Sequence, residues 1–175
     1  MSQEKKKKRL SPHVVCAWVA PWMALSWMGF IFSNSLKTGA ESGEQSSRVH
    51  ETVNEVIHSL GINEEISEGA VRDLAHFIEF FVLGVLVCFS VVSIWRALGG
   101  TRFSGLVKYS TLSIPVCVFT AAFDESIQTL SEGRSAEVLD VILDSFGTLM
   151  GNVSFVLFAW ILWRIKRGIA KRRAL

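Results

Sequence analysis

The chain has few of the residues that mark disulfide-rich, zinc-binding or disordered proteins. Its 175 residues include only three cysteines and three prolines. The cysteines are odd in number, lie within apolar runs and show no metal-type spacing, so neither a disulfide framework nor a zinc knuckle is expected. Half of the residues are hydrophobic, which is too many for a disordered chain. We therefore expect one folded domain over residues 1–175.

Charge is scarce in four long stretches. Residues 14–32 carry none, and at about 1.5 Å per residue they nearly cross a hydrocarbon core of ~30 Å. This run is longer than the roughly 7–15 apolar residues of a signal peptide and does not end in small residues, so we expect it to be uncleaved. The pattern predicts an all-α integral membrane protein, a four-helix transmembrane bundle with spans at about 13–33, 74–95, 109–128 and 138–163. Pro21 and Pro115 are expected to bend their helices.

The segment between the first two spans, residues 34–72, is polar and rich in glutamate. Its apolar residues recur at helical spacing from Val49 to Leu60, with Glu51 and Glu55 on the opposite face. This predicts an amphipathic helix of about three turns that ends at Gly61. Such a helix is expected to lie along the membrane surface or to cap the bundle.

Lysine and arginine are distributed unevenly along the chain. Of the 18, 14 lie in the basic tails, residues 1–12 and 164–175, or between the second and third spans. Loops rich in these residues stay in the cytoplasm. The pattern therefore predicts a multi-pass protein of a cell membrane with both termini cytoplasmic and the 34–72 loop outside.

The ionisable residues that interrupt the predicted spans all fall at one depth once this topology is applied. An ionised side chain at the bilayer centre costs on the order of 2.5–3.5 kcal/mol, so such residues need partners. They lie near the outer ends of the second, third and fourth spans, each on one stripe of its helix. The candidate binding residues are Arg72, His76, Glu125, Gln128, Arg134 and Asp140, and the candidate catalytic residues are Glu79, Asp124 and Asp144.

The fourth predicted span carries two acids and two glycines on one face. Asp140, Asp144, Gly147 and Gly151 follow one another at intervals of four, three and four residues. A helix with this stripe can pack closely on a neighbour while it directs its carboxylates into a shared pocket. We expect the two glycines to mark close packing within the monomer.

Charge balance at the outer end favours a site there. Glu79, Asp124, Glu125, Asp140 and Asp144 face two arginines, which leaves three negative charges for protons, a cation or a cationic ligand. A histidine among converging carboxylates suits a divalent metal. The candidate metal ligands are His76, Glu79, Asp124 and Asp140.

Several functions fit this arrangement. In an enzyme, Glu79 or Asp144 would act as general base, Asp124 and Asp140 would hold a metal or orient water, and Arg134 would hold a phosphate or carboxylate. Alternatively, the acids form a structural ion-pair network with the arginines in a non-catalytic membrane partner or scaffold. Proton-coupled transport is disfavoured because no ionisable residue continues the route through the inner half of the spans.

The ordered polar motifs resemble those of the VanZ-like membrane proteins, which are named for an accessory protein of glycopeptide (teicoplanin) resistance in Gram-positive bacteria. The resemblance covers most of the chain and rests on Phe32-Ser33, Arg72, Ala75-His76-Phe77, Glu79, Asp124-Glu125, Gln128, Gly133-Arg134, Asp140, Asp144, Gly147 and Gly151. The chain departs from the usual pattern with Asp73 in place of Lys, Phe80 in place of Tyr and Leu130 in place of Phe.

This resemblance implies a small multi-pass protein of the bacterial cell membrane. As partners we predict membrane lipids and a lipid-linked cell-wall precursor or a glycopeptide, and no nucleic acid. From the outer position of the polar residues we predict that the pocket binds or modifies an envelope lipid or lipid-linked cell-wall component.

Overall fold

The computed structural model of the protein describes residues 11–135 and 137–173. Within these residues the fold consists of six helices and no strands, which confirms the all-α prediction. The helices are α1 (Pro12–Ser35), α2 (Gly39–Ser59), α3 (Glu68–Ala97), α4 (Phe103–Ser110), α5 (Ser113–Gln128) and α6 (Val138–Arg173). Most of the predicted N-terminal tail, residues 1–10, and residues 174–175 of the C-terminal tail lie outside the described part.

Four segments are long and apolar enough to cross a membrane: α1, α3, α4 with α5, and α6. They match the four predicted spans, although α3 starts six residues before the expected position and α6 ends ten residues after it. Ser67 starts α3 as its N-cap, accepting a hydrogen bond from the Ala70 backbone N–H at 3.2 Å. The last ten residues of α6 are rich in lysine and arginine, which favour helix but not bilayer, so the helix continues beyond the predicted span.

The third span contains a break rather than the kink expected at Pro115. The break lies at Thr111 and Leu112, so Pro115 falls in the first turn of α5. Proline has no N–H to donate to the carbonyl four residues back, and its ring would clash with that group, which here belongs to Thr111. Asn152 of α6 compensates at the break, because its side-chain amide donates to the Ser110 carbonyl oxygen at 2.9 Å.

Helix α2 is longer than the sequence pattern suggested. We expected its start near Val49, but it begins ten residues before that, at Gly39. Thr38 and Glu41 form a capping box there: Thr38 Oγ1 accepts from the Glu41 backbone N–H at 3.3 Å, and Glu41 Oε2 accepts from that of Thr38 at 3.0 Å. The bond from the Thr38 N–H holds the pKa of Glu41 below its usual value. The helix ends before Gly61, as expected, where φ is +80°.

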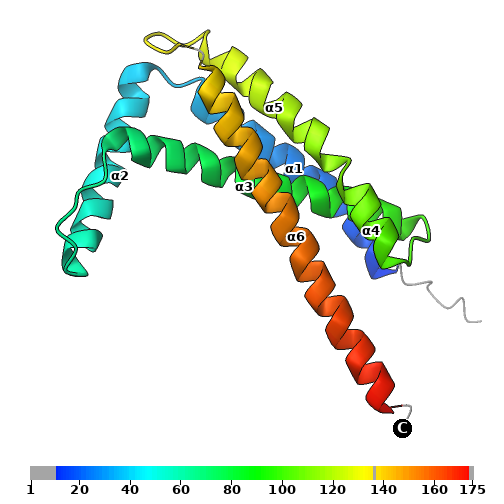
Figure 1. Cartoon of the computed structure of the whole chain (residues 1–175). Coiled ribbons are helices and arrows are strands. Elements are labelled where there is room, and N and C mark those ends of the chain that lie inside the picture. The colour runs from blue at the N-terminus through cyan, green and yellow to red at the C-terminus, as the bar shows by residue number, and fades with distance from the viewer. Residues whose placement is uncertain (1–10, 136, 174–175) are drawn as a thin grey trace, which may run out of the picture.

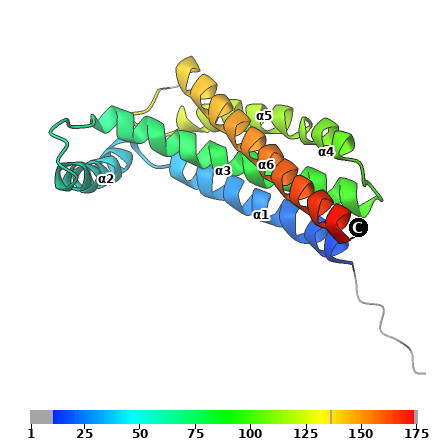
Figure 2. The same ribbon diagram turned by 60° about the horizontal axis from the view of Figure 1, so that its bottom comes forward.

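The long helices run roughly along one direction, and α2 lies across them at one end. Figure 2 shows the bundle from the side with α2 nearly end-on. Asn54 ties α2 to the loop that leads into α3, because its side-chain oxygen accepts from the Ile66 backbone N–H at 3.0 Å. This crosswise position agrees with the prediction of a helix that caps the bundle or lies along a membrane surface.

Helices α3 and α6 cross each other, as Figure 1 shows, and glycines of α6 lie against the α3 backbone. A Cβ on Gly147 would lie 2.6 Å from the Phe77 carbonyl oxygen, and one on Gly151 would collide with the Phe81 carbonyl. Both pairs advance by four residues, so the two helices run parallel in a fixed register. The predicted packing of Gly147 and Gly151 within the monomer is therefore confirmed, and the register brings the start of α6 beside His76.

The bundle buries polar side chains and exposes apolar ones. Trp18 is 72% and Phe119 71% exposed, as expected of surfaces that face lipid. A small apolar core around Phe80 and Leu83 lies between α1, α3 and α5. The buried polar residues include Asp124 and Asp144, whose exposed fraction is 0%. Acids buried in such a bundle are candidates for a functional site.

Candidate functional site

One end of the bundle, which we call the polar end, is where α1 and α5 finish and α3 and α6 begin. Figure 1 shows the 129–137 connection and the start of α2 at this end. The backbone N–H of Gly39 donates to the Glu132 carbonyl oxygen at 2.8 Å and joins these two segments. All nine candidate site residues lie on these helix ends or on the connection between α5 and α6.

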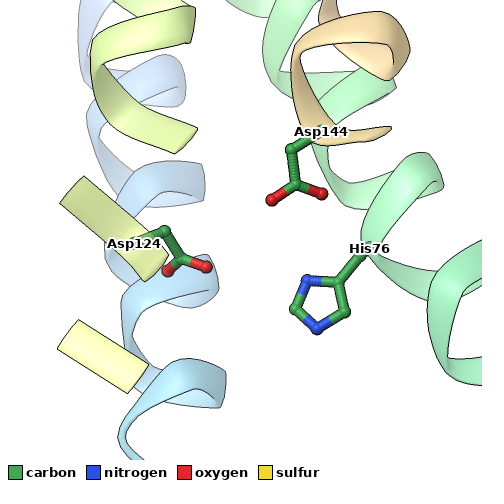
Figure 3. Close-up of side chains that lie close together, drawn as sticks. All are labelled: His76, Asp124 and Asp144. Atoms are coloured by element: carbon green, nitrogen blue, oxygen red, sulfur yellow. The ribbon is translucent and has the colours of Figure 1, made fainter. Parts of the chain in front are cut away.

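Three of the candidate residues meet inside the polar end. His76 of α3, Asp124 of α5 and Asp144 of α6 each offer one ligand atom, and these atoms lie within 4.8 Å of one another. Figure 3 shows the three side chains directed toward a common space. We call them the His–Asp–Asp cluster. It unites residues that the sequence separates by up to 68 positions.

Asp124 is held firmly by its neighbours. Its Oδ1 accepts a hydrogen bond from Ser35 Oγ at 2.6 Å, and its Oδ2 accepts one from Gln128 Nε2 at 3.1 Å. Gln128 is itself fixed by Arg134, which donates to its Oε1 at 2.7 Å. Arg134 therefore reaches Asp124 through Gln128 rather than by direct contact. These bonds fix the direction in which the Asp124 carboxylate faces the cluster.

Asp144 differs sharply from Asp124. Among the residues that the structure describes, neither of its carboxylate oxygens has a hydrogen-bond partner, and the same holds for His76 Nδ1. A buried acid without a partner is costly unless it is neutralised by a proton or a cation. The His–Asp–Asp cluster thus joins one well-supported carboxylate to one that is free to bind a ligand.

Glu79 lies one turn beyond His76 but outside the cluster. Its Oε1 accepts from Asn34 Nδ2 at 2.8 Å, and Asn34 Oδ1 in turn accepts from Lys37 Nζ at 2.9 Å. Asn34 and Ser35 were not among the expected site residues, because they stand at the start of the polar segment that was expected to be a loop. They are the last two residues of α1. Their side chains bring α1 into the site.

Glu125 connects α5 to the start of α6. Its Oε1 accepts from the Glu137 backbone N–H at 2.5 Å, while its Oε2 is buried without a partner in the described part of the chain. This bond places a carboxylate at the N-terminus of α6, which is the positive end of the helix dipole. Glu125 therefore helps to place Asp144.

Two adjoining hollows open on the polar end beneath α2. The large hollow has a volume of about 320 Å³, and the small hollow about 90 Å³. Arg72 and Arg134 line both, His76 and Glu79 line the small one, and Asp140 lines the large one. Among the residues that the structure describes, every one that lines the large hollow is polar or a glycine: Gly39, Ser42, Gly43, Ser46, Glu68, Gly69, Arg72, Gln128, Gly133, Arg134, Ser135, Glu137 and Asp140.

The arginines do not form ion pairs with the buried acids. In residues 11–135 and 137–173, the only ion pairs are Arg48–Glu44 at 2.6 Å and His58–Glu65 at 3.8 Å, both outside the cluster. The described structure therefore contains none of the arginine–acid pairs that the hypothesis of a structural ion-pair network requires. Of the four metal ligands expected from sequence, the structure brings His76 and Asp124 together and adds Asp144, while Glu79 and Asp140 lie apart from them.

Fold and site together define a small helical membrane protein with four spans and a buried polar centre at one end. The chain belongs to the VanZ/LLP1 family, whose model matches residues 22–161. That range contains every residue of the polar end discussed above. Comparison with curated proteins and with solved structures found no match.

Proposed function

We propose that the polar end binds the anionic headgroup of an envelope lipid or a lipid-linked cell-wall component. The observation that carries the proposal is the large hollow of about 320 Å³ with Arg72 and Arg134 in its wall. This volume lies at the lower end of the range for ligand sites. Because its described lining has no apolar side chain, the large hollow suits a polar headgroup better than an acyl chain.

The distribution of basic residues supports an outward-facing hollow. Nine of the 18 lysines and arginines lie at the opposite end of the bundle or on the part of α6 that leads away from it, and five more precede α1 in the sequence. By the positive-inside rule that end faces the cytoplasm, and the polar end faces the outer surface, where envelope headgroups lie. The same arrangement reduces the cost of the buried acids, because they lie at the shallow part of the bilayer.

The chemistry of the lining favours a headgroup with several kinds of polar group. Arg72 and Arg134 suit a phosphate or carboxylate, for which guanidinium groups are well shaped. Ser42, Ser46 and Asp140 suit hydroxyl or amine groups on the same ligand. Exposed apolar residues of α2, among them Val49 and Val56, and Leu60 directly after the helix offer a surface for the attached hydrocarbon chain.

The site also contains groups that would serve a modifying reaction. Glu79 lines the small hollow with one carboxylate oxygen held by Asn34, in a position to accept a proton from water or from a headgroup hydroxyl. Asp124 and Asp144 lie deeper, beside His76. By binding or modifying such a lipid, the protein would alter the target of glycopeptide antibiotics, as the family's name suggests.

Neutralising the arginines of the large hollow is expected to weaken lipid binding. Arg134→Gln and Arg72→Gln should each raise the Kd for phosphatidylglycerol and for undecaprenyl phosphate about 10-fold or more, because a hydrogen bond to a charged group contributes about 1.5–3 kcal/mol. Native mass spectrometry of the purified protein, titrated with each lipid, measures this change. Phosphatidylcholine, which lacks net negative charge, should bind more weakly and respond less.

Arg48→Gln is the matched control. Arg48 is an exposed arginine on α2 at the same end of the bundle, but it pairs with Glu44 and lies outside the large hollow. Its replacement should leave lipid binding within about twofold of wild type, since exposed pairs contribute little. Equal lipid affinity in Arg134→Gln, Arg72→Gln and wild type would refute the proposed headgroup site.

A further inference from the structure

We propose that His76, Asp124 and Asp144 form a site for one divalent metal ion. The proposal goes beyond headgroup binding and does not depend on it, because a metal can be measured without a lipid. It rests on three observations: the convergence of the ligand atoms, the absence of partners at Asp144 in the described structure, and the support given to Asp124.

The separation of the ligand atoms suits a shared ion. They lie within 4.8 Å of one another. Nitrogen and oxygen ligands bind zinc at about 2.0–2.2 Å, so two ligands of one ion lie no more than about 4.4 Å apart. Small side-chain rotations bring the three atoms into this range. Figure 3 shows that the side chains already face one another from three helices.

The environment of Asp144 is an independent indication that this site binds an ion. Its side chain is fully buried, and both of its oxygens lack partners among the described residues. It points toward the space between His76 and Asp124, as Figure 3 shows. His76 Nδ1 is likewise buried without a partner. A metal ion would satisfy these atoms at once, whereas no neighbouring side chain in the described structure does so.

Charge at the cluster also matches a divalent cation. Two carboxylates and a neutral imidazole carry two negative charges, and a divalent ion balances them. Arg134 donates to Gln128 instead of to either acid. No ion pair in the described chain involves Asp124 or Asp144, so the cluster's charge is not already neutralised by a basic side chain.

The surroundings resemble those that orient metal ligands. A carboxylate that binds metal is usually held by further hydrogen bonds, as Ser35 and Gln128 hold Asp124. Of the three ligands, His76 lines the small hollow, so an ion would enter from that side. One imidazole with two carboxylates suits zinc or manganese better than soft metals. The remaining coordination positions would bind water or an oxygen of the headgroup.

Metal analysis of the detergent-purified protein tests the site. We expect wild type to bind about one equivalent of zinc or manganese after exposure to the ion and removal of excess. Asp144→Asn should weaken binding at least about 100-fold, since even outer partners of a metal ligand contribute 10–100-fold. Asp73→Asn is the control: Asp73 is an exposed acid on the same helix as His76, three residues before it, and its loss should leave stoichiometry and affinity unchanged.

Two results would overturn the proposal. One is a wild type that binds no zinc, manganese, magnesium or calcium. The other is equal binding by wild type and Asp144→Asn, which would place the ion elsewhere. Retention of the metal by Arg134→Gln, together with loss of lipid binding in that variant, would separate this site from the headgroup site. Intact lipid binding in a protein that binds no metal would refute the metal site alone.

Discussion

Alanine at Asp124 or at Asp144 is expected to abolish the envelope phenotype of the protein while folded protein remains in the membrane. Each substitution removes one of the two carboxylates of the His–Asp–Asp cluster, and both of these carboxylates are fully buried and lie close to His76. The phenotype to measure is the gain in teicoplanin survival of a Gram-positive host that expresses the chain. Either variant should lose that gain.

The amount of folded protein must be measured in the same cells. Gel filtration of fluorescently tagged protein from detergent extracts gives this amount for each variant. Asp73→Ala serves as the matched control because it also removes an acid near His76, but an exposed one. Full activity of Asp124→Ala and Asp144→Ala, at wild-type amounts of protein, would show that the cluster is not a functional site.

Asp144→Asn and Asp124→Asn are expected to change stability in opposite directions. In chelator, Asp144→Asn should increase the free energy of unfolding by on the order of 1–2 kcal/mol, because it removes a buried acid that must either stay charged without a partner in the described structure or take up a proton at a cost. Asp124→Asn should decrease it by about 1–3 kcal/mol, because its new amide would meet the donating amide of Gln128. Denaturation of the purified proteins in the same detergent measures both changes.

Added metal should reverse the order of wild type and Asp144→Asn. At a metal concentration 100 times its Kd, binding stabilises the folded state by about 2.7 kcal/mol. Wild type would gain this and the variant would not. A large loss of stability of Asp144→Asn in chelator would mean that Asp144 belongs to a structural network, since breaking a buried pair costs about 3–5 kcal/mol.

Much of the fold follows from the sequence, because a bilayer allows few structures. Uncharged runs long enough to cross it must be helices, and this sufficed to predict four spans. The topology that follows from lysine and arginine then placed residues as distant as His76 and Asp144 at one end of the bundle. The sequence pattern did not predict the start of α2, which is set by the capping residue Thr38. It also misplaced the interruption of the third span, which lies one turn before Pro115 rather than at the proline itself.

The detailed composition of the site depends on packing that a linear pattern does not specify. Of the two acids on this face of α6, Asp144 and not Asp140 lies beside His76, because Gly147 and Gly151 fix the register of α6 on α3. Ser35 supports Asp124 only because the end of α1 packs beside α5. Sequence stripes identified which faces turn inward, but not which side chains on those faces come within bonding distance. These contacts required the three-dimensional arrangement.

Cysteine labelling in intact cells tests the central claim, that the site opens on the outer surface of the membrane. Glu132→Cys places a thiol in the exposed connection between α5 and α6, and Arg102→Cys places one between α3 and α4, both in a Cys16→Ser background. A membrane-impermeant maleimide should label Glu132→Cys in intact cells and Arg102→Cys only after permeabilisation. The opposite pattern would place the polar end in the cytoplasm and contradict the proposed contact with the outer envelope.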